Sequence, residues 1–418
     1  MKKSIITLAM LLALTAQADT LSDAFAEAKV DGEIRSVHYS RDATNSPIFG
    51  EASGTALGGS LGISTKAINN ITFNTRFYTT NAISGSGTKL ANTNLVDGTE
   101  NYTILGEMNL EYDDGTNMLK VGRQALATPL VYSDDARMVK DLFEAASFST
   151  KIIPDTTLRA LYIHRNSGMD NDFAGNNLGK SNFVSMSKTL GTSYDEGMAV
   201  LAIENSSIPD VTLQAWYYDS FKLVDMFYYD ASYKTNISKD MSFQLQGHYW
   251  TIKSKSEYEI DTGKKIDYNY GGVRASFIND GLTLQVAQER INYEDQTVGI
   301  HTAWGMYTEY TYGILMGSGI YGALNGFGGQ YITKVDATKL TLKYDFGNDI
   351  NTYIGYNIFD GNNDAFMSDI NLLDVYLAFP CQLIKNASWA LLYENWDSNG
   401  NKIMVDNNLL KLKLTYKF

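Results

Sequence analysis

Cysteine, proline and long apolar runs are all scarce in this sequence. The 418 residues include one cysteine and five prolines. The single Cys381 excludes an internal disulfide framework. It also lies far from the N-terminus, which excludes a lipid-modified first residue of an exported chain. No apolar run reaches the roughly 18–20 residues that a membrane-spanning helix needs. We therefore expect no helical membrane span.

The charge and the length exclude further classes. The formal net charge of −13 argues against a nucleic-acid partner. On an exported barrel it fits acidic external loops, where cations can bridge to the lipopolysaccharide layer. A chain of 418 residues could form two or three soluble domains. No Pro/Ser-rich linker or shift in composition divides it, however, and one large barrel accounts for both observations.

The N-terminus carries an export signal. Lys2 and Lys3 are followed by an apolar stretch at residues 5–14 and by a small-x-small cleavage site at residues 16–18. This pattern predicts a cleaved signal peptide over residues 1–18. We expect residues 19–28 to form a short periplasmic segment with a helical turn.

The last nine residues divide into an apolar and a polar face. Leu410, Leu412, Leu414, Tyr416 and the terminal Phe418 fall on one side of a period-2 strand, and the intervening positions carry Lys411, Lys413, Thr415 and Lys417. A transmembrane barrel needs this division, because one face of each strand meets lipid and the other meets water. An aromatic C-terminal residue on such a strand also resembles the signal that hands outer-membrane proteins to their assembly machinery.

Similar alternation recurs along the chain. Ile71, Phe73 and Phe77, for example, alternate with polar neighbours that include Arg76. Short connections are expected at 279–281 and 347–349, and long polar ones at 79–100, 166–194, 253–266 and 360–369. Residues 29–418 are thus predicted to form an all-β, antiparallel transmembrane β-barrel of roughly 16–18 strands, with short periplasmic turns and long extracellular loops. The predicted location is the outer membrane of a Gram-negative bacterium.

Several motifs resemble those of a known family. They lie at residues 121–124 (VGRQ), 128–130 (TPL), 133–137 (SDDAR), 141–144 (DLFE) and 303–309 (AWGMYTE), and at the start of the mature chain in Leu21, Ala24, Val30, Gly32, Ile34 and Arg35. This set resembles the OprD-type outer-membrane porins, and in particular the porins and major outer-membrane proteins of epsilonproteobacteria.

The resemblance implies a channel of about 18 strands, often trimeric. A loop folded into its lumen, expected here near residues 125–140, would narrow the pore. Five charged or polar residues of this loop are candidates for the constriction: Tyr132, Asp134, Asp135, Arg137 and Lys140. In a narrow lumen, opposed charges create a transverse field that orients small solutes. The alternative is a solvated external loop with no role in the pore.

The family also implies a row of lumenal arginines that guides carboxylate-bearing nutrients. Arg76 and Arg274 fall on the polar faces of their strands, which makes them candidates. Arg123 is a further candidate, although it shares its parity with Leu119 and Val121 and faces the lumen only if a bulge intervenes. The family's basic constriction conflicts with the acidic charge of the chain, so the ion preference stays open.

No catalytic motif is present, and no cofactor is expected. Four acidic residues are weak candidates for Ca²⁺ ligands in loops: Asp170, Asp172, Asp360 and Asp364. The predicted function is passive diffusion of small hydrophilic solutes and ions, with some preference among charged nutrients. The expected partners are lipid, lipopolysaccharide, the solutes, the assembly machinery and further copies in a homotrimer. The alternatives are an outer-membrane barrel enzyme of the phospholipase kind and a secreted β-rich adhesin.

Overall fold

The fold is described from a computed structural model. It describes residues 18–43, 50–169, 171, 178–295, 297–298, 304, 310–311, 333–362, 370–399 and 406–418. The predicted signal peptide therefore lies outside the described residues apart from its last position. The same holds for the motif at residues 303–309 apart from Trp304.

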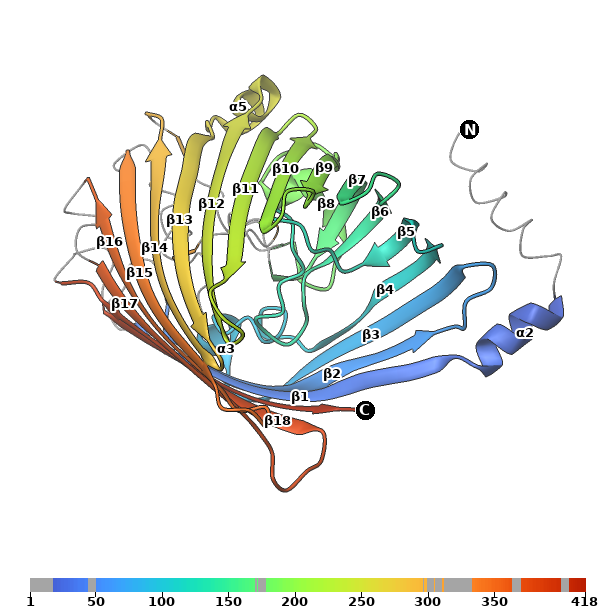
Figure 1. The fold of residues 1–418 in the computed structure, drawn as a ribbon. Helices are drawn as coiled ribbons and strands as arrows, with labels where there is room; N and C mark the ends of the chain where they lie inside the picture. Colours follow the sequence, from blue (N-terminus) through green and yellow to red (C-terminus); the bar gives the residue numbers. More distant parts are fainter. Residues whose placement is uncertain are drawn as a thin grey trace.

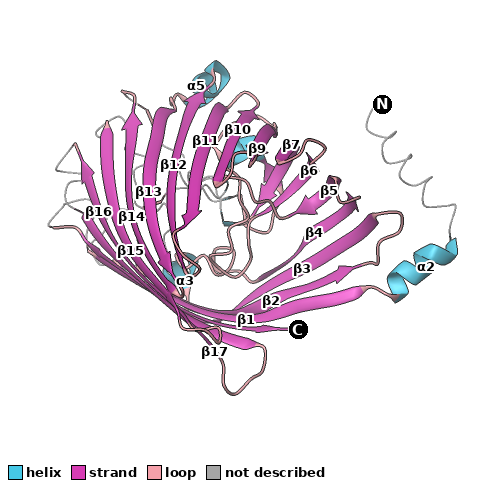
Figure 2. Cartoon of the chain, in the orientation of Figure 1, coloured by secondary structure: helices cyan, strands magenta, loops and turns pink. Residues whose placement is uncertain are grey.

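Strands dominate the described chain (Figures 1 and 2). They are β1 (Lys29–Asp42), β2 (Ala52–Ser64), β3 (Ile71–Ser84), β4 (Tyr102–Asp113), β5 (Asn117–Gln124), β6 (Leu142–Thr150), β7 (Thr156–Ser167), β8 (Val184–Ser185), β9 (Met198–Asn205), β10 (Val211–Ser220), β11 (Val224–Asn236), β12 (Met241–Ser254), β13 (Asp267–Asn279), β14 (Leu282–Tyr293), β15 (Lys334–Asp345), β16 (Asn351–Gly361), β17 (Ile370–Pro380), β18 (Ala387–Asp397) and β19 (Asn407–Lys417). The helices are α2 (Ala18–Ala26), α3 (Gly87–Ala91), α4 (Met186–Thr189) and α5 (Ser256–Thr262). No helix in the described ranges is long and apolar enough to cross a membrane.

The strands form one closed antiparallel barrel. Each pairs with its neighbours in sequence order, and β1 pairs with β19 from Glu33↔Lys417 to Asp42↔Asn408. The two-residue β8 pairs only with the end of β7, while β9 continues the wall beside β7. The described sheet of 19 strands thus contains an 18-stranded barrel once β8 is set aside. Among the described strands, closure of the barrel leaves no unpaired sheet edge, as a lipid environment requires.

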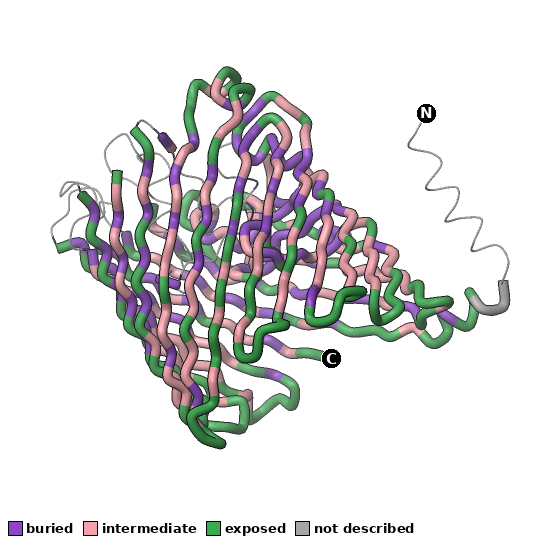
Figure 3. The backbone as a smooth tube through the Cα atoms, turned by 45° about the horizontal axis from the view of Figure 1, so that its top comes forward, coloured by how far each residue is buried: buried purple, intermediate pink, exposed green. Residues whose placement is uncertain are grey.

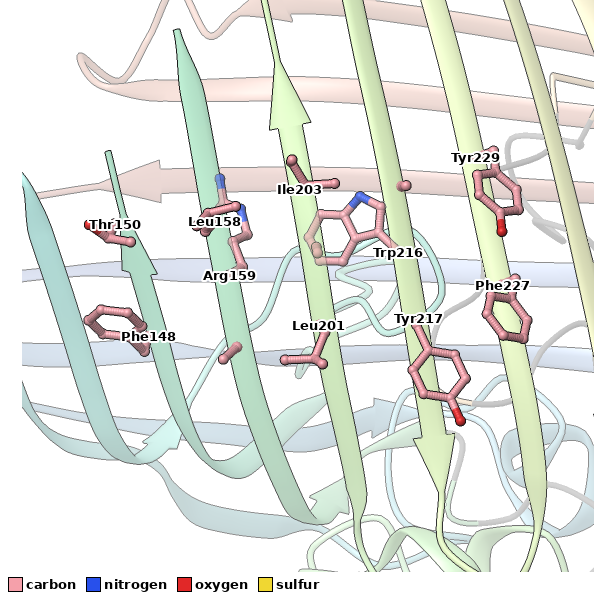
Figure 4. A pocket seen from close by; sticks show the side chains of 13 residues that line it. Phe148, Thr150, Leu158, Arg159, Leu201, Ile203, Trp216, Tyr217, Phe227 and Tyr229 are labelled. Carbon is pink, nitrogen blue, oxygen red and sulfur yellow. The ribbon is translucent and has the colours of Figure 1, made fainter. Parts of the chain in front are cut away.

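More and less exposed positions alternate along many strands (Figure 3), because successive side chains point in turn to the outer face and to the lumen face. In β19, Leu412 is 38 % exposed on the outer face, whereas its neighbour Lys411 is 5 % exposed on the lumen face. The division predicted for the last strand is therefore present. Elsewhere the outer face carries a hollow of about 510 Å³, lined by Leu201 and Ile203 on β9 and by Phe227 on β11 (Figure 4).

The two ends of the barrel differ in their connections, as predicted. One end, here called the turn end, carries short connections such as 114–116 and 280–281. The opposite loop end carries longer ones such as 85–101, 125–141 and 168–197. Residues 221–223 are an exception, because they form a short connection at the loop end. Leu223 in this connection is fully buried, and its carbonyl accepts a hydrogen bond from Lys255 N at 2.7 Å.

Candidate functional site

The connection between β5 and β6, residues 125–141, crosses the lumen. Near its end, Asp135 accepts hydrogen bonds from Arg35 on β1. Near its start, Leu130 N donates to Tyr218 Oη on β10 at 3.2 Å. Because roughly half of the strands separate β1 from β10 in either direction, these two anchors lie on opposite sides of the barrel. The connection is called the crossing loop below.

Arg35 fixes one end of the crossing loop. Its Nη1 and Nη2 donate to the two carboxylate oxygens of Asp135 at 2.7 and 2.8 Å, and Nη1 also donates to Arg137 O at 2.9 Å. Glu33 lies 2.6 Å from Nη2 on the same strand. The Arg35 side chain is only 5 % exposed. A bidentate guanidinium–carboxylate pair is geometrically specific, so this contact sets the position of Asp135 in the lumen.

Arg137 joins the crossing loop to a second inward segment. Its Nε donates to Thr93 O at 3.1 Å, and its guanidinium lies 4.5 Å above the ring of Tyr39 on β1. Thr93 belongs to the connection 85–101, which is held to the wall where Thr80 Oγ1 on β3 donates to Leu95 O at 2.7 Å. Two connections therefore pack together against β1 and β3.

Lysines from the last strand complete the polar lining. Lys411 Nζ donates to Ala136 O at 2.5 Å, and Lys413 lies near Asp135. The constriction cluster is defined here as the cations Arg35, Arg41, Arg137, Lys140, Lys411 and Lys413 with the carboxylates Glu33, Asp134 and Asp135. Positive charge is in excess in this cluster, although the whole chain is acidic. Low-dielectric walls strengthen the effect of such a local excess.

The two neighbouring carboxylates of the crossing loop have opposite pKa shifts. Burial raises the pKa of Asp134 above its ordinary value, even though Arg137 and Lys411 oppose the shift. Burial also acts to raise the pKa of Asp135, but the hydrogen bonds and charge of Arg35 outweigh it, so the pKa of Asp135 lies below its ordinary value. Asp135 is thus held as an anion, whereas Asp134 takes up a proton more readily.

A second contact holds a short segment, residues 310–311, against the lumen face of β14. Glu289 on β14 is fully buried and accepts hydrogen bonds from Tyr310 N at 2.6 Å, Thr311 N at 2.8 Å and Tyr270 Oη at 2.7 Å. Thr311 Oγ1 is a further donor, and His248 Nε2 lies 3.0 Å away. A buried carboxylate is tolerated when it is this fully satisfied. Residues 310–311 are therefore fixed inside the barrel.

Tyr310 covers the predicted lumenal residue Arg274. The Arg274 guanidinium lies 4.2 Å from the centre of the Tyr310 ring, and its Nη2 donates to Gln246 Oε1 at 2.6 Å. Gly272 on the same strand leaves room for the contact, because a Cβ there would lie 2.5 Å from Glu289 Cγ. The lumen-face position predicted for Arg274 is correct, but Tyr310 occupies one side of its guanidinium.

The other loop candidates differ in exposure. Tyr132 is 44 % exposed, and its backbone N donates to Trp304 O at 2.9 Å. Lys140 is partly exposed, and its charge acts on Asp135. Arg76 lies on the lumen face of β3, where it pairs with Asp31 and donates to Ser60 Oγ at 3.2 Å. Arg76 Nε also lies 3.8 Å from Glu107 Oε1, which accepts a hydrogen bond from Tyr78 Oη at 2.6 Å.

Arg123 points away from the lumen, contrary to its inclusion among the pore candidates. It lies opposite Met108, which is 48 % exposed on the outer face, and shares its parity with the exposed Val121. Its Nε pairs with Glu144 Oε1 at 3.0 Å on the neighbouring strand. The period-2 rule holds to the end of β5, so the bulge that would have turned Arg123 inward is not present there.

Sequence reasoning overlooked five members of the constriction cluster: Glu33, Arg35, Arg41, Lys411 and Lys413. Lys411 and Lys413 sit on the polar face of the predicted last strand, which was the available signal for these two. The contacts of Arg35 and Lys411 with the crossing loop, however, join residues about 100 to 275 positions apart. Local patterns do not carry information about such distant pairs.

The structure gives little support for the proposed calcium ligands. Asp360 is exposed on β16, and Asp170, Asp172 and Asp364 lie outside the described residues. Within the described ranges, no group of three or more His, Cys, Asp or Glu side chains is placed to hold a metal ion.

Comparison with known proteins identifies the fold. No protein-family model and no curated protein matches the chain. Among solved structures, OpdK of Pseudomonas aeruginosa with vanillate matches with a TM-score of 0.71 and 15 % identity, over 94 % of this chain and 99 % of that chain. OccK9 (OpdG) of the same organism matches with a TM-score of 0.73 and 15 % identity, over 94 % and 99 %. OccAB2 of Acinetobacter baumannii matches with a TM-score of 0.71 and 15 % identity, over 95 % and 99 %. The chain therefore has the fold of the OprD-type porins, as the sequence resemblance predicted.

Proposed function

We propose that the protein is an outer-membrane porin through which small hydrophilic solutes and ions diffuse passively. The observation that carries this proposal is the crossing loop, which lies inside a closed barrel and brings charged side chains into its lumen. A closed barrel with an apolar outer face and a polar lumen is suited to a water-filled path through lipid. The OprD-type fold supports the same function.

The charge of the constriction cluster supports a preference for anions. Cations outnumber carboxylates in the cluster, and Asp135 is already engaged by Arg35. An excess of fixed positive charge in a narrow pore raises the local concentration of anions and lowers that of cations. Small carboxylates fit this field, and vanillate, present in the OpdK structure, is one such carboxylate. The constriction, rather than the net charge of the chain, would then set the selectivity.

The alternatives find less support. A barrel phospholipase would need a nucleophile and a base exposed on one lipid-facing site, and the fold is that of channels. We therefore infer that the protein is not an enzyme. A secreted adhesin would not require the lipid-compatible outer face that Leu412 and its neighbours provide.

Export and assembly follow from the two ends of the chain. We infer that residues 1–18 are cleaved as a signal peptide, that residues 19–28 stay at the periplasmic side with the turn end, and that the loop end is extracellular. The C-terminal strand with Leu410, Leu412, Leu414, Tyr416 and Phe418 would be recognised by the assembly machinery. Lipid and lipopolysaccharide would surround the barrel, and a homotrimer is the assembly that the family resemblance supports.

Channel activity in a planar bilayer tests the proposal. Refolded protein should give stable conductance steps that scale with salt concentration. As a matched pair, Tyr132→Ala in the crossing loop should alter the conductance, whereas Ser238→Ala in a turn-end connection should leave it unchanged. A correctly folded barrel without conductance steps would contradict the proposal.

A further inference from the structure

Three charged residues cluster on the outer face near the loop end. Arg123 on β5, Glu144 on β6 and Arg165 on β7 lie on successive strands, with Glu144 between the two arginines. The register of β6 against β7 shifts between Glu144 and Ala145, so that Arg165 lies opposite Glu144 and Ile163 opposite Ala145. This bulge turns Arg165 to the outer face, which it shares with Tyr162.

The guanidinium of Arg165 has N–H donors that can still bind an acceptor. Its Nη1 lies 3.8 Å from Glu144 Oε2, beyond hydrogen-bond distance, and its side chain is 39 % exposed. Within the described ranges it makes no hydrogen bond. Arg123 is more engaged, since its Nη1 donates to Leu105 O at 3.0 Å and its guanidinium lies 4.2 Å from the ring of Phe183. A guanidinium with open N–H donors beside lipid is costly unless an anion accepts from it.

An apolar groove with Arg123 and Glu144 at one end extends toward the middle of the barrel wall, and Arg165 lies beside that end, next to Glu144. It has a volume of about 580 Å³. Met108, which lies opposite Arg123, and Tyr162 form its sides, and Val121 and the small Ala146 lie between them. Val121, Ala146 and Tyr162 are nearer the turn end than the three charged residues. The narrow side chain of Ala146 leaves space that a hydrocarbon chain can fill.

The charge around the groove favours an anionic group. Asp195 lies in the connection 168–197. A hydrogen bond from Ser185 lowers the pKa of Asp195 most, and the charges of Lys188, Arg165 and His164 lower it further. The cations Arg123, Arg165 and Lys188 outnumber the carboxylates Glu144 and Asp195. An apolar groove with a cationic end matches a molecule with an acyl chain and a phosphate.

We propose that this groove binds lipopolysaccharide, with a phosphate at Arg165 and an acyl chain between Met108 and Tyr162. The choice of lipid depends on the proposed function, because the loop end faces the outer leaflet only if the barrel lies in an outer membrane as inferred above. The inner-leaflet phospholipids share the phosphate and acyl chemistry, but they would meet the turn end.

Lipid binding to the refolded, delipidated full chain tests the proposal. Purified lipopolysaccharide or phosphatidylglycerol is titrated in detergent, and bound lipid is counted by native mass spectrometry. Lipopolysaccharide should bind more tightly than phosphatidylglycerol. Arg165→Gln should weaken it roughly tenfold or more, as expected for loss of a charge-assisted hydrogen bond. Ala146→Phe, which fills the groove but keeps the charges, should weaken it as well.

Arg290→Gln is the matched control. Arg290 is also an outer-face arginine near the loop end, but its Nε and Nη2 donate to Asp336 at 2.6 and 3.2 Å. Its replacement should leave lipopolysaccharide binding unchanged. Equal binding of the two lipids, no effect of Arg165→Gln in a folded barrel, or an equal loss in Arg290→Gln would overturn the proposal. Conductance of the same samples separates this result from a failure of the porin function, because Arg165 lies outside the pore.

Discussion

Arg35 and Asp135 illustrate how single residues fix a connection inside the barrel. Their bidentate pair spans 100 positions in the sequence and fastens the crossing loop to β1. Asp135 is 43 % exposed, so solvent in the lumen reaches the pair and weakens its electrostatic energy. The pair therefore contributes more to the position of the loop than to the stability of the barrel.

Asp135→Asn should loosen the crossing loop without unfolding the barrel. The neutral amide keeps the shape but loses the charge-assisted bonds to Arg35, each worth roughly 1.5–3 kcal/mol where burial is high and less where the pair is exposed. We expect larger current fluctuations in single-channel records and an unchanged circular dichroism spectrum. Asp280→Asn, in a turn-end connection, is the control. Current fluctuations in Asp135→Asn no larger than in the unmodified channel would show that the Arg35–Asp135 pair does not hold the loop.

The opposite pKa shifts of Asp134 and Asp135 predict how selectivity depends on pH. As pH falls from 7 toward about 4, Asp134 takes up a proton first because its pKa is raised, while Asp135 stays ionised to a pH below about 3.9. Loss of one negative charge should shift the reversal potential further toward anions. The shift should be absent in Asp134→Asn. An equal shift in that variant would assign the titration to another group.

The same shifts have opposite effects on stability. The raised pKa of Asp134 means that its ionisation costs stability above that pKa, and the cost disappears as pH falls below the ordinary Asp value of about 3.9. The lowered pKa of Asp135 means that its ionised form stabilises the fold above about 3.9, and this stabilisation is lost as pH falls through the lowered value.

Individual strand positions were largely predictable from sequence, and the failures have physical causes. The faces of β3 and β19 follow from period-2 alternation. Ile104 and Met108 would share one face of an unbroken strand, yet Met108 lies on the outer face and Ile104 is buried on the lumen side. The register shift between Arg76 and Phe77, opposite Gly106, reverses the parity. A one-residue bulge leaves little trace in a hydrophobic pattern.

At the scale of elements, two connections enter the lumen from different walls. The crossing loop is held at β1 and β10, and residues 310–311 are held at β14 by Glu289. The location of the crossing loop near residues 125–140 came from family resemblance. The role of Glu289 was not predicted, because nothing in the sequence indicates that Tyr310 and Thr311, in the connection after β14, fold back onto that strand.

Gly272→Ala should release the contact at Glu289. The added Cβ would lie 2.5 Å from Glu289 Cγ and 3.1 Å from His248 Nε2, which forces the carboxylate away from Tyr310 and Thr311. We expect a higher single-channel conductance because the segment no longer narrows the lumen. Gly247→Ala is the matched control, since a Cβ there meets its nearest neighbour only at 3.6 Å. Equal conductance in both variants would contradict a narrowing role for residues 310–311.

At the scale of the whole molecule, β1 and β19 close the barrel and carry much of the constriction cluster. Gly32 N donates to Phe418 O at 3.0 Å, and Phe418 N donates to Gly32 O at 3.1 Å. The lumen face of the same seam supplies Arg35, Lys411 and Lys413. The apolar and polar faces of the last strand, both visible in the sequence, thus have separate tasks in the structure.

The outer face of β19 should tolerate charge poorly. Leu412→Lys places an ammonium group beside lipid, at a cost of roughly 2–4 kcal/mol near the middle of the bilayer. We expect less folded barrel after refolding into vesicles, measured by the mobility shift on heating. Lys413→Gln, on the lumen face of the same strand, should fold as well as the unmodified chain. Equal folding yields would mean that Leu412 does not face lipid.

The reversal potential of single channels under a potassium chloride gradient tests the central claim most directly. The excess of cations in the constriction cluster predicts a potential that favours chloride, and it should move toward zero in the double variant Lys411→Gln/Lys413→Gln. A potential that favours potassium would contradict the account, because the net negative charge of the chain, rather than its constriction, would then govern selectivity.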